Sequence, residues 1–298
     1  IKEMPKVTLN EEQKAIKLKM DEIYAEILKK AVISEEQAKN AKDGKIINGC
    51  LFLLNKKYKV EQYKYRQDIR FVVAKNLTQM PGGMFCRCYN LEHVYIPNLA
   101  KIRDAQEDNY YGSFQGAGLK EICFPKLIKA GFRAFDCCQS IKIVTLPLCE
   151  ELGDYCFFSC CDIEKLNLPK VKFLGEASLQ DCSSLATLLV PSLEDIGPAA
   201  LNACRKLKEI DCKLQADKLI CCDYCQEKKD CVICRGKVQE CQKRFKLNGL
   251  KPILNLVQSQ QQNLLLEVTS CLKTKRNDID TIAVIDQSYR TTVDKPSE

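Results

Sequence analysis

Four cysteines in the C-terminal third form two C-x-x-C pairs, which is the arrangement in this chain with the clearest capacity for chemistry. The pairs are Cys222 with Cys225 and Cys231 with Cys234. Four thiolates at such spacing can hold a tetrahedral zinc ion. The five residues between the pairs are fewer than most zinc ribbons use, and two of these cysteines lie at or beside positions of a repeat described below. We therefore favour a decayed repeat over a zinc module at residues 222–234 or a redox dithiol, and we predict no metal.

The sequence offers few residues suited to general acid–base catalysis. His93 is the single histidine of the chain, so the usual histidine pairs and triads are unavailable. It belongs to a predicted strand, at a position that we expect to face solvent. No glycine-rich loop of the kind that cradles phosphates follows a predicted strand. We predict no catalytic residue and no cofactor, and an enzyme is the less favoured functional class.

The elements that carry these residues repeat every 22 residues. Five columns share that spacing, which is the signature of a solenoid. The columns are Pro125, Pro147, Pro169 and Pro191; Gly131, Gly153, Gly175 and Gly197; Cys138, Cys160, Cys182 and Cys204; Phe135, Phe157, Leu179 and Leu201; and Leu119, Ile141, Ile163, Leu185 and Leu207.

Each repeat predicts one coil of an α/β solenoid of the leucine-rich repeat type. The apolar residues before the proline follow L-x-x-I-x-L, and the last two are two residues apart, as one face of a strand requires. The proline then ends the strand, because it has no N–H to donate. A single coil cannot bury its apolar edge, so the coils must stack with parallel strands on the concave face. We count seven coils and expect an eighth, degenerate one.

Two columns invite a structural explanation before a chemical one. We expect the glycine column to supply the turn conformation that other residues resist. The cysteine column places thiols of adjacent coils within disulfide range. Buried cysteine commonly packs as a small apolar residue, and we favour packing for this column, whose position is filled by Cys88 and Gly116 in earlier coils.

Two segments carry a resemblance to a known family. They are Phe85-Cys-Arg-Cys-Tyr-Asn-Leu-Glu-His-Val-Tyr-Ile-Pro97 and Phe157-Phe-Ser-Cys-Cys-Asp-Ile-Glu-Lys-Leu-Asn-Leu-Pro169. Both resemble the BspA-like leucine-rich repeats, also called the treponemal type, of bacterial surface proteins and parasitic protists. The resemblance implies a right-handed solenoid with a concave binding face and a role in protein binding or adhesion. A cell-surface adhesin or antigen of the BspA type is thus the alternative function.

The segments on either side of the repeats have a different composition. Residues 1–45 predict a helical N-terminal extension or cap, with helix starts at Asn10 and Ser34, each followed three residues later by glutamine. We favour a cap over the open edge of the solenoid; a partner-binding or self-associating helix is the alternative. The solenoid is expected over 46–235, with regular repeats at 69–212. Residues 236–298 predict a helical and partly disordered C-terminal extension.

The function predicted from these patterns is a non-catalytic scaffold for protein–protein interaction. The partner would be a protein or an extended peptide bound on the concave face by the outward residues of each strand, a row that mixes aromatic, apolar and charged groups as interfaces do. The predicted binding face consists of His93, Tyr95, Glu121, Cys123, Ile143, Thr145, Lys165, Asn167, Thr187, Leu189, Glu209 and Asp211. The sequence does not indicate the oligomeric state.

Charge and hydropathy argue against nucleic-acid and membrane roles. Residues 85–212 carry 14 Lys and Arg against 17 Asp and Glu, so the repeats lack the basic stripe that binds phosphates. No segment has the 18 or so consecutive apolar residues of a membrane span. The first twenty residues contain no apolar signal-peptide core, and twenty cysteines suit a reducing compartment. We expect a cytoplasmic location, or a secreted or cell-surface one if a signal peptide precedes Ile1.

Overall fold

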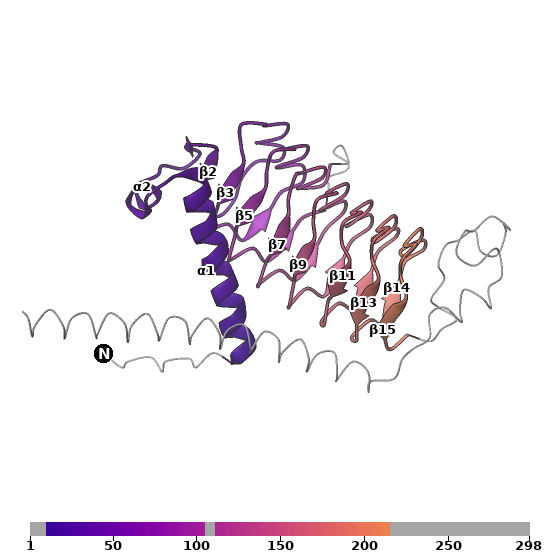
Figure 1. Ribbon diagram of the computed structural model, residues 1–298. Coiled ribbons are helices and arrows are strands. Elements are labelled where there is room, and N and C mark those ends of the chain that lie inside the picture. Colours follow the sequence, from indigo (N-terminus) through magenta and orange to yellow (C-terminus); the bar gives the residue numbers. More distant parts are fainter. Residues whose placement is uncertain (1–9, 105–110, 215–298) are drawn as a thin grey trace, which may run out of the picture. The chain divides into compact units, whose positions relative to one another are not determined.

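The computed structural model describes residues 10–104 and 111–214, and they form a stack of coils (Figure 1). Each coil contributes one strand to a column that we call the strand column. Its members are β2 (Cys50–Phe52), β3 (Phe71–Val73), β5 (His93–Tyr95), β7 (Glu121–Cys123), β9 (Ile143–Thr145), β11 (Lys165–Asn167), β13 (Thr187–Val190) and β15 (Glu209–Cys212). Within the column, β2, β3 and β5 pair in parallel, as do β7 and β9, and β11, β13 and β15, with partners about one repeat apart in sequence, such as Leu166 opposite Leu188. The predicted parallel solenoid with a 22-residue period is confirmed.

The middle residue of each strand points inward and builds one continuous core. Val94, Ile122, Leu166, Leu188 and Ile210 are all buried in it. The degenerate first repeat belongs to the same core, since Ile69, Val72, Ala74, Leu77 and Met80 are buried as well. Because successive side chains of a strand alternate between faces, the residues on either side of each buried one face outward.

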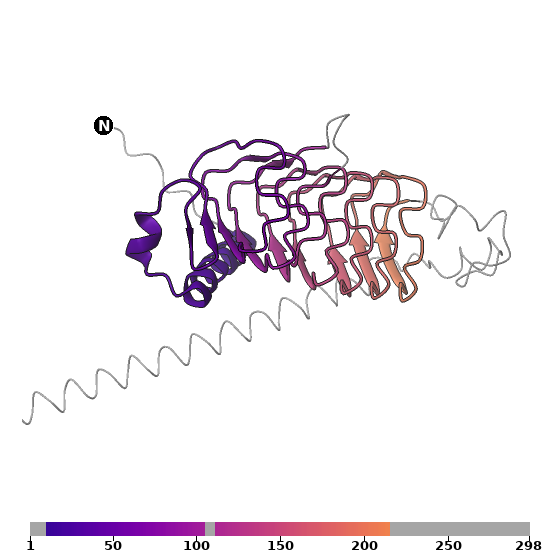
Figure 2. The same ribbon diagram turned by 90° about the horizontal axis from the view of Figure 1, so that it is seen from above.

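A second sheet of two-residue strands runs along the stack. It contains β4 (Gln79–Met80), β6 (Lys101–Ile102), β8 (Lys129–Ala130), β10 (Glu151–Leu152), β12 (Phe173–Leu174) and β14 (Asp195–Ile196), paired in that order and in parallel. The second residue of each strand points into the core, whereas the first is exposed or half-buried. Seen from above, the coils connect the two sets of strands as stacked loops (Figure 2).

The glycine column has a different role from the one that its turn position predicted. None of Gly131, Gly153, Gly175 and Gly197 is at positive φ; that conformation falls two residues later, for example at Ala177 with φ 49°. A Cβ on Gly175 would instead lie 2.6 Å from the main-chain nitrogen of Asp154 in the preceding coil. Glycine is required here because the backbones of adjacent coils approach too closely for a side chain.

The interior is completed by an aromatic column beside the cysteine column. Rings of neighbouring coils stack, with centroids 5.6 Å apart for Phe85 and Phe114 and 4.9 Å for Phe135 and Phe157. In the coil that contains Phe114, the cysteine position is filled by Ala117 and not by Gly116. The main-chain N–H of Gly116 bonds to the next coil as that of Cys137 does, so this coil is one residue shorter at that point.

The thiols of the cysteine column are buried and donate hydrogen bonds. Their acceptors are main-chain oxygens of the aromatic column one coil earlier: Phe114 for Cys138, Phe135 for Cys160, Phe157 for Cys182 and Leu179 for Cys204, at 2.9–3.2 Å. Burial raises the pKa of the Cys160 thiol well above its ordinary value. The column therefore packs, as the sequence indicates, and its thiols give a second hydrogen bond to carbonyls that already accept a main-chain N–H within their own turn.

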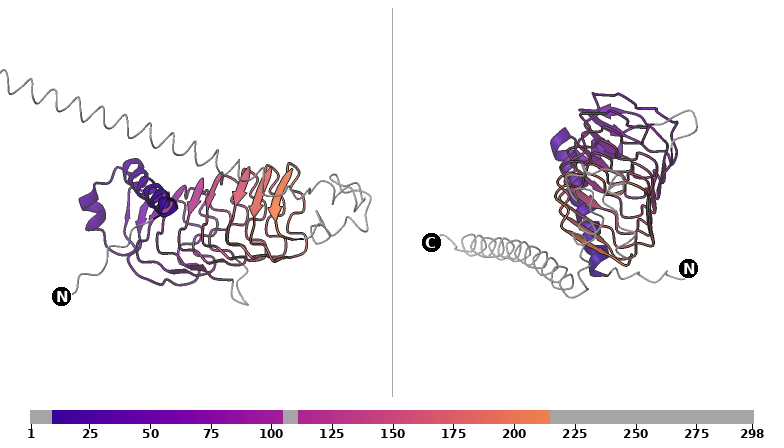
Figure 3. Two further views of the ribbon diagram at one scale, coloured as in Figure 1. Left: turned by 90° about the horizontal axis from the view of Figure 1, so that it is seen from below. Right: turned by 90° about the vertical axis from the view of Figure 1, so that its right-hand side faces the viewer.

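The N-terminal segment forms two helices and a short hairpin strand. α1 (Glu11–Ala31) and α2 (Glu35–Lys39) each begin with the predicted capping box, at Asn10 and Ser34. β1 (Ile46–Ile47) pairs antiparallel with β2 at the start of the strand column. α1 does not close the open edge of the solenoid as the cap interpretation supposed. It lies across the outward surface of the first strands (Figures 1 and 3).

Candidate functional site: the strand face

The outward residues of the strand column form one surface, which we call the strand face. They are the first and third residues of each strand. In β11, β13 and β15 they line up in two rows, because Lys165 lies opposite Thr187 and Thr187 opposite Glu209. Strands stack at roughly 4.8 Å, so four coils present a surface roughly 14 Å long. Such a surface can contact a segment of another protein without any change in the coils.

α1 covers the N-terminal part of the strand face. Met20, Ile23, Ile27, Leu28 and Ala31 of the helix pack on the strands. The strand residues beneath them are Cys50, Phe52, Phe71, Val73 and Cys123, with Tyr95 half-buried at the margin. None of these residues belongs to the main solenoid core. The helix and its partners thus form a separate apolar cluster, which we call the α1 cluster.

Polar contacts hold the helix at the same place. The rings of Tyr24 and Tyr95 lie 4.9 Å apart, and the ammonium of Lys75 lies 4.4 Å from the centre of the Tyr24 ring. Lys19 forms an ion pair of 2.9 Å with Glu121 across the helix–strand boundary. Both side chains of this ion pair are only partly exposed, so salt screens their attraction less than that of a fully exposed pair.

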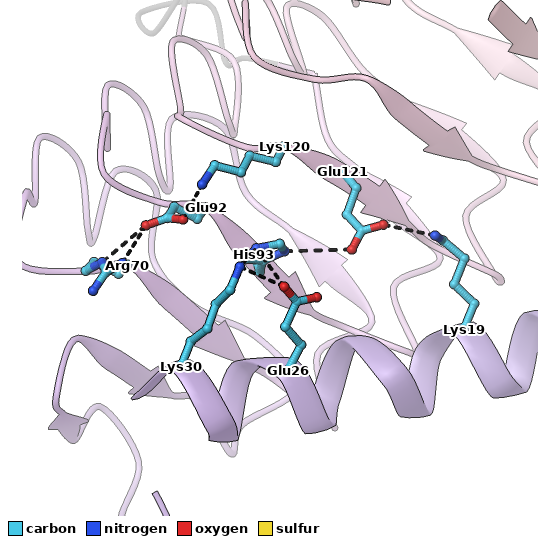
Figure 4. Close-up of polar contacts among 8 residues, drawn as sticks. All are labelled: Lys19, Glu26, Lys30, Arg70, Glu92, His93, Lys120 and Glu121. Atoms are coloured by element: carbon cyan, nitrogen blue, oxygen red, sulfur yellow. Dashed lines mark hydrogen bonds and ion pairs between the residues drawn. The ribbon is translucent and has the colours of Figure 1, made fainter. Parts of the chain in front are cut away.

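His93 is the centre of these contacts (Figure 4). It lies on β5 with 5% of its surface exposed. The Lys30 ammonium is 3.0 Å from Nε2 and 2.7 Å from a carboxylate oxygen of Glu26. Because an ammonium can only donate, Nε2 accepts, and the neutral ring carries its proton on Nδ1. Nδ1 has no hydrogen-bond partner and faces a Glu121 oxygen at 3.8 Å.

The pKa values of His93 and of the neighbouring Glu26 are both lowered. The pKa of His93 is lowered, mainly by burial and then by the Lys30 charge, against the attraction of Glu26, Glu121 and Glu92. The hydrogen bond from Lys30 lowers the pKa of Glu26. The site therefore favours a neutral imidazole beside an ionised carboxylate.

A metal ion is not the best occupant of this cluster, although its geometry invites the question. Atoms of Glu26, His93 and Glu121 lie within 4.8 Å of one another, the only such trio among the residues that the structure describes. The Lys30 ammonium already occupies the space between Glu26 and Nε2, where an ion bound to both would have to lie. Lys19 likewise neutralises Glu121. The trio is a cation site that the protein fills with its own lysines.

A second charged group lies beside the cluster. Glu92 accepts from Lys120 at 2.5 Å and from Arg70 at 2.7 Å, and both cations lower its pKa to about 2. It therefore remains ionised throughout the physiological range and contributes a constant charge near His93.

The structure separates the predicted binding residues into two groups. His93, Tyr95, Glu121 and Cys123 lie at or under α1, so the expectation that His93 faces solvent is wrong. The helix displaces solvent from these positions because their neighbours on the strand face are apolar. In the second group, Ile143, Lys165, Asn167 and Glu209 are exposed, Thr145 and Asp211 half-buried, and Thr187 and Leu189 buried.

Some contributors to the strand face escaped the sequence analysis. Glu26, Lys30 and Lys19 reach it from α1, and Phe52 and Phe71 from the first two strands of the strand column. A signal for them is visible in the sequence. Outward positions are apolar in Phe52, Phe71 and Tyr95 but polar in Lys165 and Asn167. Apolar outward residues need a cover, and an amphipathic helix precedes them.

The candidate zinc ligands Cys222, Cys225, Cys231 and Cys234 lie outside the described residues. So do the expected eighth coil beyond residue 214, the C-terminal extension at 236–298 and residues 105–110. Among the described residues, no helix is long and apolar enough to cross a membrane.

The repeats match a known family. The pattern of the BspA type leucine-rich repeat region fits residues 56–113 and 108–221 with six copies, which is more than half of the chain. The chain belongs to this family. Families of this kind are generally non-enzymatic and support a protein-interaction or adhesin-like role. No curated protein matches the chain.

Solved structures that match part of the chain include leucine-rich repeat proteins. One is a leucine-rich repeat protein of T. pallidum, with 18% identity and a TM-score of 0.35 over 48% of this chain and 58% of that one. Another is from Bacteroides ovatus, with 17% identity and a TM-score of 0.35 over 55% of each chain. The pneumococcal vaccine antigen PcpA matches at 13% identity and a TM-score of 0.27, over 56% and 57% of the two chains. The match thus spans little more than half of each neighbour.

Proposed function

We propose that the chain binds a protein or an extended peptide on the part of the strand face beyond α1. This part, which we call the open strand face, consists of the outward residues Ile143, Thr145, Lys165, Asn167, Glu209 and Asp211 of β9, β11 and β15, whereas the outward residues Thr187 and Leu189 of β13 are buried. The observation that carries the proposal is the exposure of Ile143, the first residue of β9, half of whose surface is accessible. A large aliphatic side chain exposed beside polar groups is typical of an interface anchor.

The neighbours of Ile143 suit a partner with both polar and apolar groups. Lys165 and Glu209 offer opposite charges in one row, and Asn167 offers amide groups in the other. Among the described residues, none after Cys123 belongs to the α1 cluster, so α1 does not cover the outward residues of these strands. The mixture argues against phosphate recognition, which would need several convergent cations.

Site-specific photocrosslinking tests this proposal. A photoreactive amino acid would be placed in turn at Ile143, Lys165 and Asn167 in the full chain expressed in its native source. Matched controls are Lys101 and Asp195, which are exposed on the second sheet. We expect a discrete adduct from the open strand face and none from the second sheet. The adduct from position 165 should disappear when Ile143→Arg is also present. Equal adducts from both sheets would contradict the assignment.

We also propose that the protein works in a reducing compartment such as the cytosol. The thiol hydrogen bonds of Cys138, Cys160 and Cys182 support this, because each needs a thiol and not a disulfide sulfur. Cells would be quenched with acid, and the denatured protein alkylated before reduction. Alkylation of these three cysteines is the expected result, and alkylation only after reduction would contradict it.

A further inference from the structure

α1 can leave the strand face without opening the solenoid. Its packing partners form the α1 cluster, whereas the inward residues of the same strands belong to the main core. On β3, for example, Val72 packs inward while Phe71 and Val73 contact the helix. On β5, Val94 packs inward while Tyr95 contacts the helix. Loss of the helix would uncover one surface and leave the stacking of coils intact.

The hydrogen bond that joins the helix to His93 depends on the protonation state of the ring. Lys30 donates to Nε2 at 3.0 Å, and this is possible only while Nε2 carries no proton. A protonated ring would direct an N–H at the ammonium and place two positive charges at hydrogen-bond distance. The contact that now favours docking would become repulsive.

Every charged group around the ring can be assigned. α1 contributes Lys30 and Glu26, and β7 contributes Glu121, whose other oxygen is held by Lys19. Glu92 precedes His93 in the chain and is held by Arg70 and Lys120. β3 presents the uncharged ring of Phe71, stacked on the imidazole at 6.2 Å. The three carboxylates are each shared with a lysine, which reduces what they can offer to an imidazolium.

We propose that α1 is a proton-released cover of the strand face: it docks while His93 is neutral and accepts from Lys30, and it leaves when the imidazole takes up a proton. Release uncovers the apolar residues Phe52, Phe71 and Val73 next to the open strand face. The surface available to a partner is therefore larger in acid. This inference goes beyond the proposed function, because it concerns the helix and needs no partner to be tested.

The direction of the effect follows from linkage. Burial and Lys30 lower the pKa of His93 in the docked state, whereas with α1 released the ring regains the ordinary value of about 6.5. Below that value the released state binds more protons than the docked state, so acid favours release. Between the ordinary and the lowered pKa, the docking constant should fall by up to about tenfold for each unit of pH.

A single tryptophan reports on docking, since the sequence contains none. Tyr24→Trp places it against Tyr95 in the full chain. Low concentrations of urea should release the helix, with a red shift in emission, before circular dichroism reports unfolding of the solenoid. Repeating this from about pH 8 to about pH 5 gives the docking constant across the histidine range. Adding Ile27→Asp to the reporter supplies the emission of the released helix.

The reporter chain should show a docking constant that falls toward acid, and His93→Gln should abolish this dependence, because glutamine can accept from Lys30 without titrating. Lys30→Gln should weaken it, whereas Lys29→Gln on the exposed side of the helix should leave it unchanged. A constant independent of pH in the reporter chain, or an equal dependence in His93→Gln, would overturn the proposal.

Hydrogen exchange of the unaltered chain gives a second readout that does not depend on the tryptophan. Amides of residues 11–31 should lose protection in acid by the same factor, after correction for the intrinsic pH dependence of exchange, while β3 and β5 keep theirs. Protection of α1 that follows that of the strands at every pH would show that the helix leaves only with global unfolding, and would also overturn the proposal.

Discussion

The covered and the open parts of the strand face are built by the same repeat yet differ in the polarity and exposure of most of their outward residues. Under α1 the strands present Phe52, Phe71 and Val73, whereas β9 and β11 present Ile143, Lys165 and Asn167. The inward residues of both parts are aliphatic and buried. Stacking of coils constrains only the inward residues, so the outward ones are free to specify what each part contacts.

A charge at an inward position should cause the largest loss of stability. The loss should be as large in the open part of the strand face as in the part under α1. Leu166→Asp buries an unpaired carboxylate where 1% of the leucine is exposed. We expect a loss of several kcal/mol and cooperative unfolding of the neighbouring coils, because each coil is stabilised by the next. Asn167→Asp is the control on the same strand and should stay within about 0.5 kcal/mol. Urea denaturation followed by circular dichroism measures both.

Truncation of an outward residue should separate the two parts more directly. Phe71→Ala removes a ring buried under α1 and should cost about 3–5 kcal/mol of helix docking. Ile143→Ala removes a half-exposed chain and should change stability by about 0.5 kcal/mol or less. Protease sensitivity of α1 and the denaturation midpoint of the solenoid provide the measurements. If both variants lost the same stability, the distinction between covered and open parts would fail.

A smaller effect tests a requirement that both parts share, namely that glycine is needed where the backbones of adjacent coils approach closely. Gly175→Ala places a methyl against the backbone of the preceding coil and should destabilise by about 1–3 kcal/mol. Ala177→Gly relieves a left-handed residue and should be neutral or stabilise by up to about 1 kcal/mol. Thermal denaturation of the two variants should therefore move in opposite directions. A Gly175→Ala variant as stable as the parent would contradict the requirement for clearance between coils.

The close approach of adjacent coils also explains why the sequence predicts the positions of the glycine column correctly but not the reason for them. The glycine column was visible from spacing alone, and it was assigned to turn conformation. Clearance depends on the distance between backbones 22 residues apart, such as Gly175 and Gly153, and no local pattern encodes that distance. The same limit produced the assignment of Gly116 to the cysteine column, because a one-residue deletion is invisible when only multiples of 22 are counted.

The sequence by itself determined the coil: its period, its inward residues, its strand positions and the two capping boxes of the N-terminal helices. These depend on neighbours within one repeat or on the next repeat in register, so periodicity exposes them. Tertiary structure alone decided where α1 lies and therefore which half of the strand face is available. That placement joins Lys30 to His93 across 63 residues and Lys19 to Glu121 across 102. Such contacts follow no repeat, because they arise only once stacking has brought the outward residues of separate coils onto one surface.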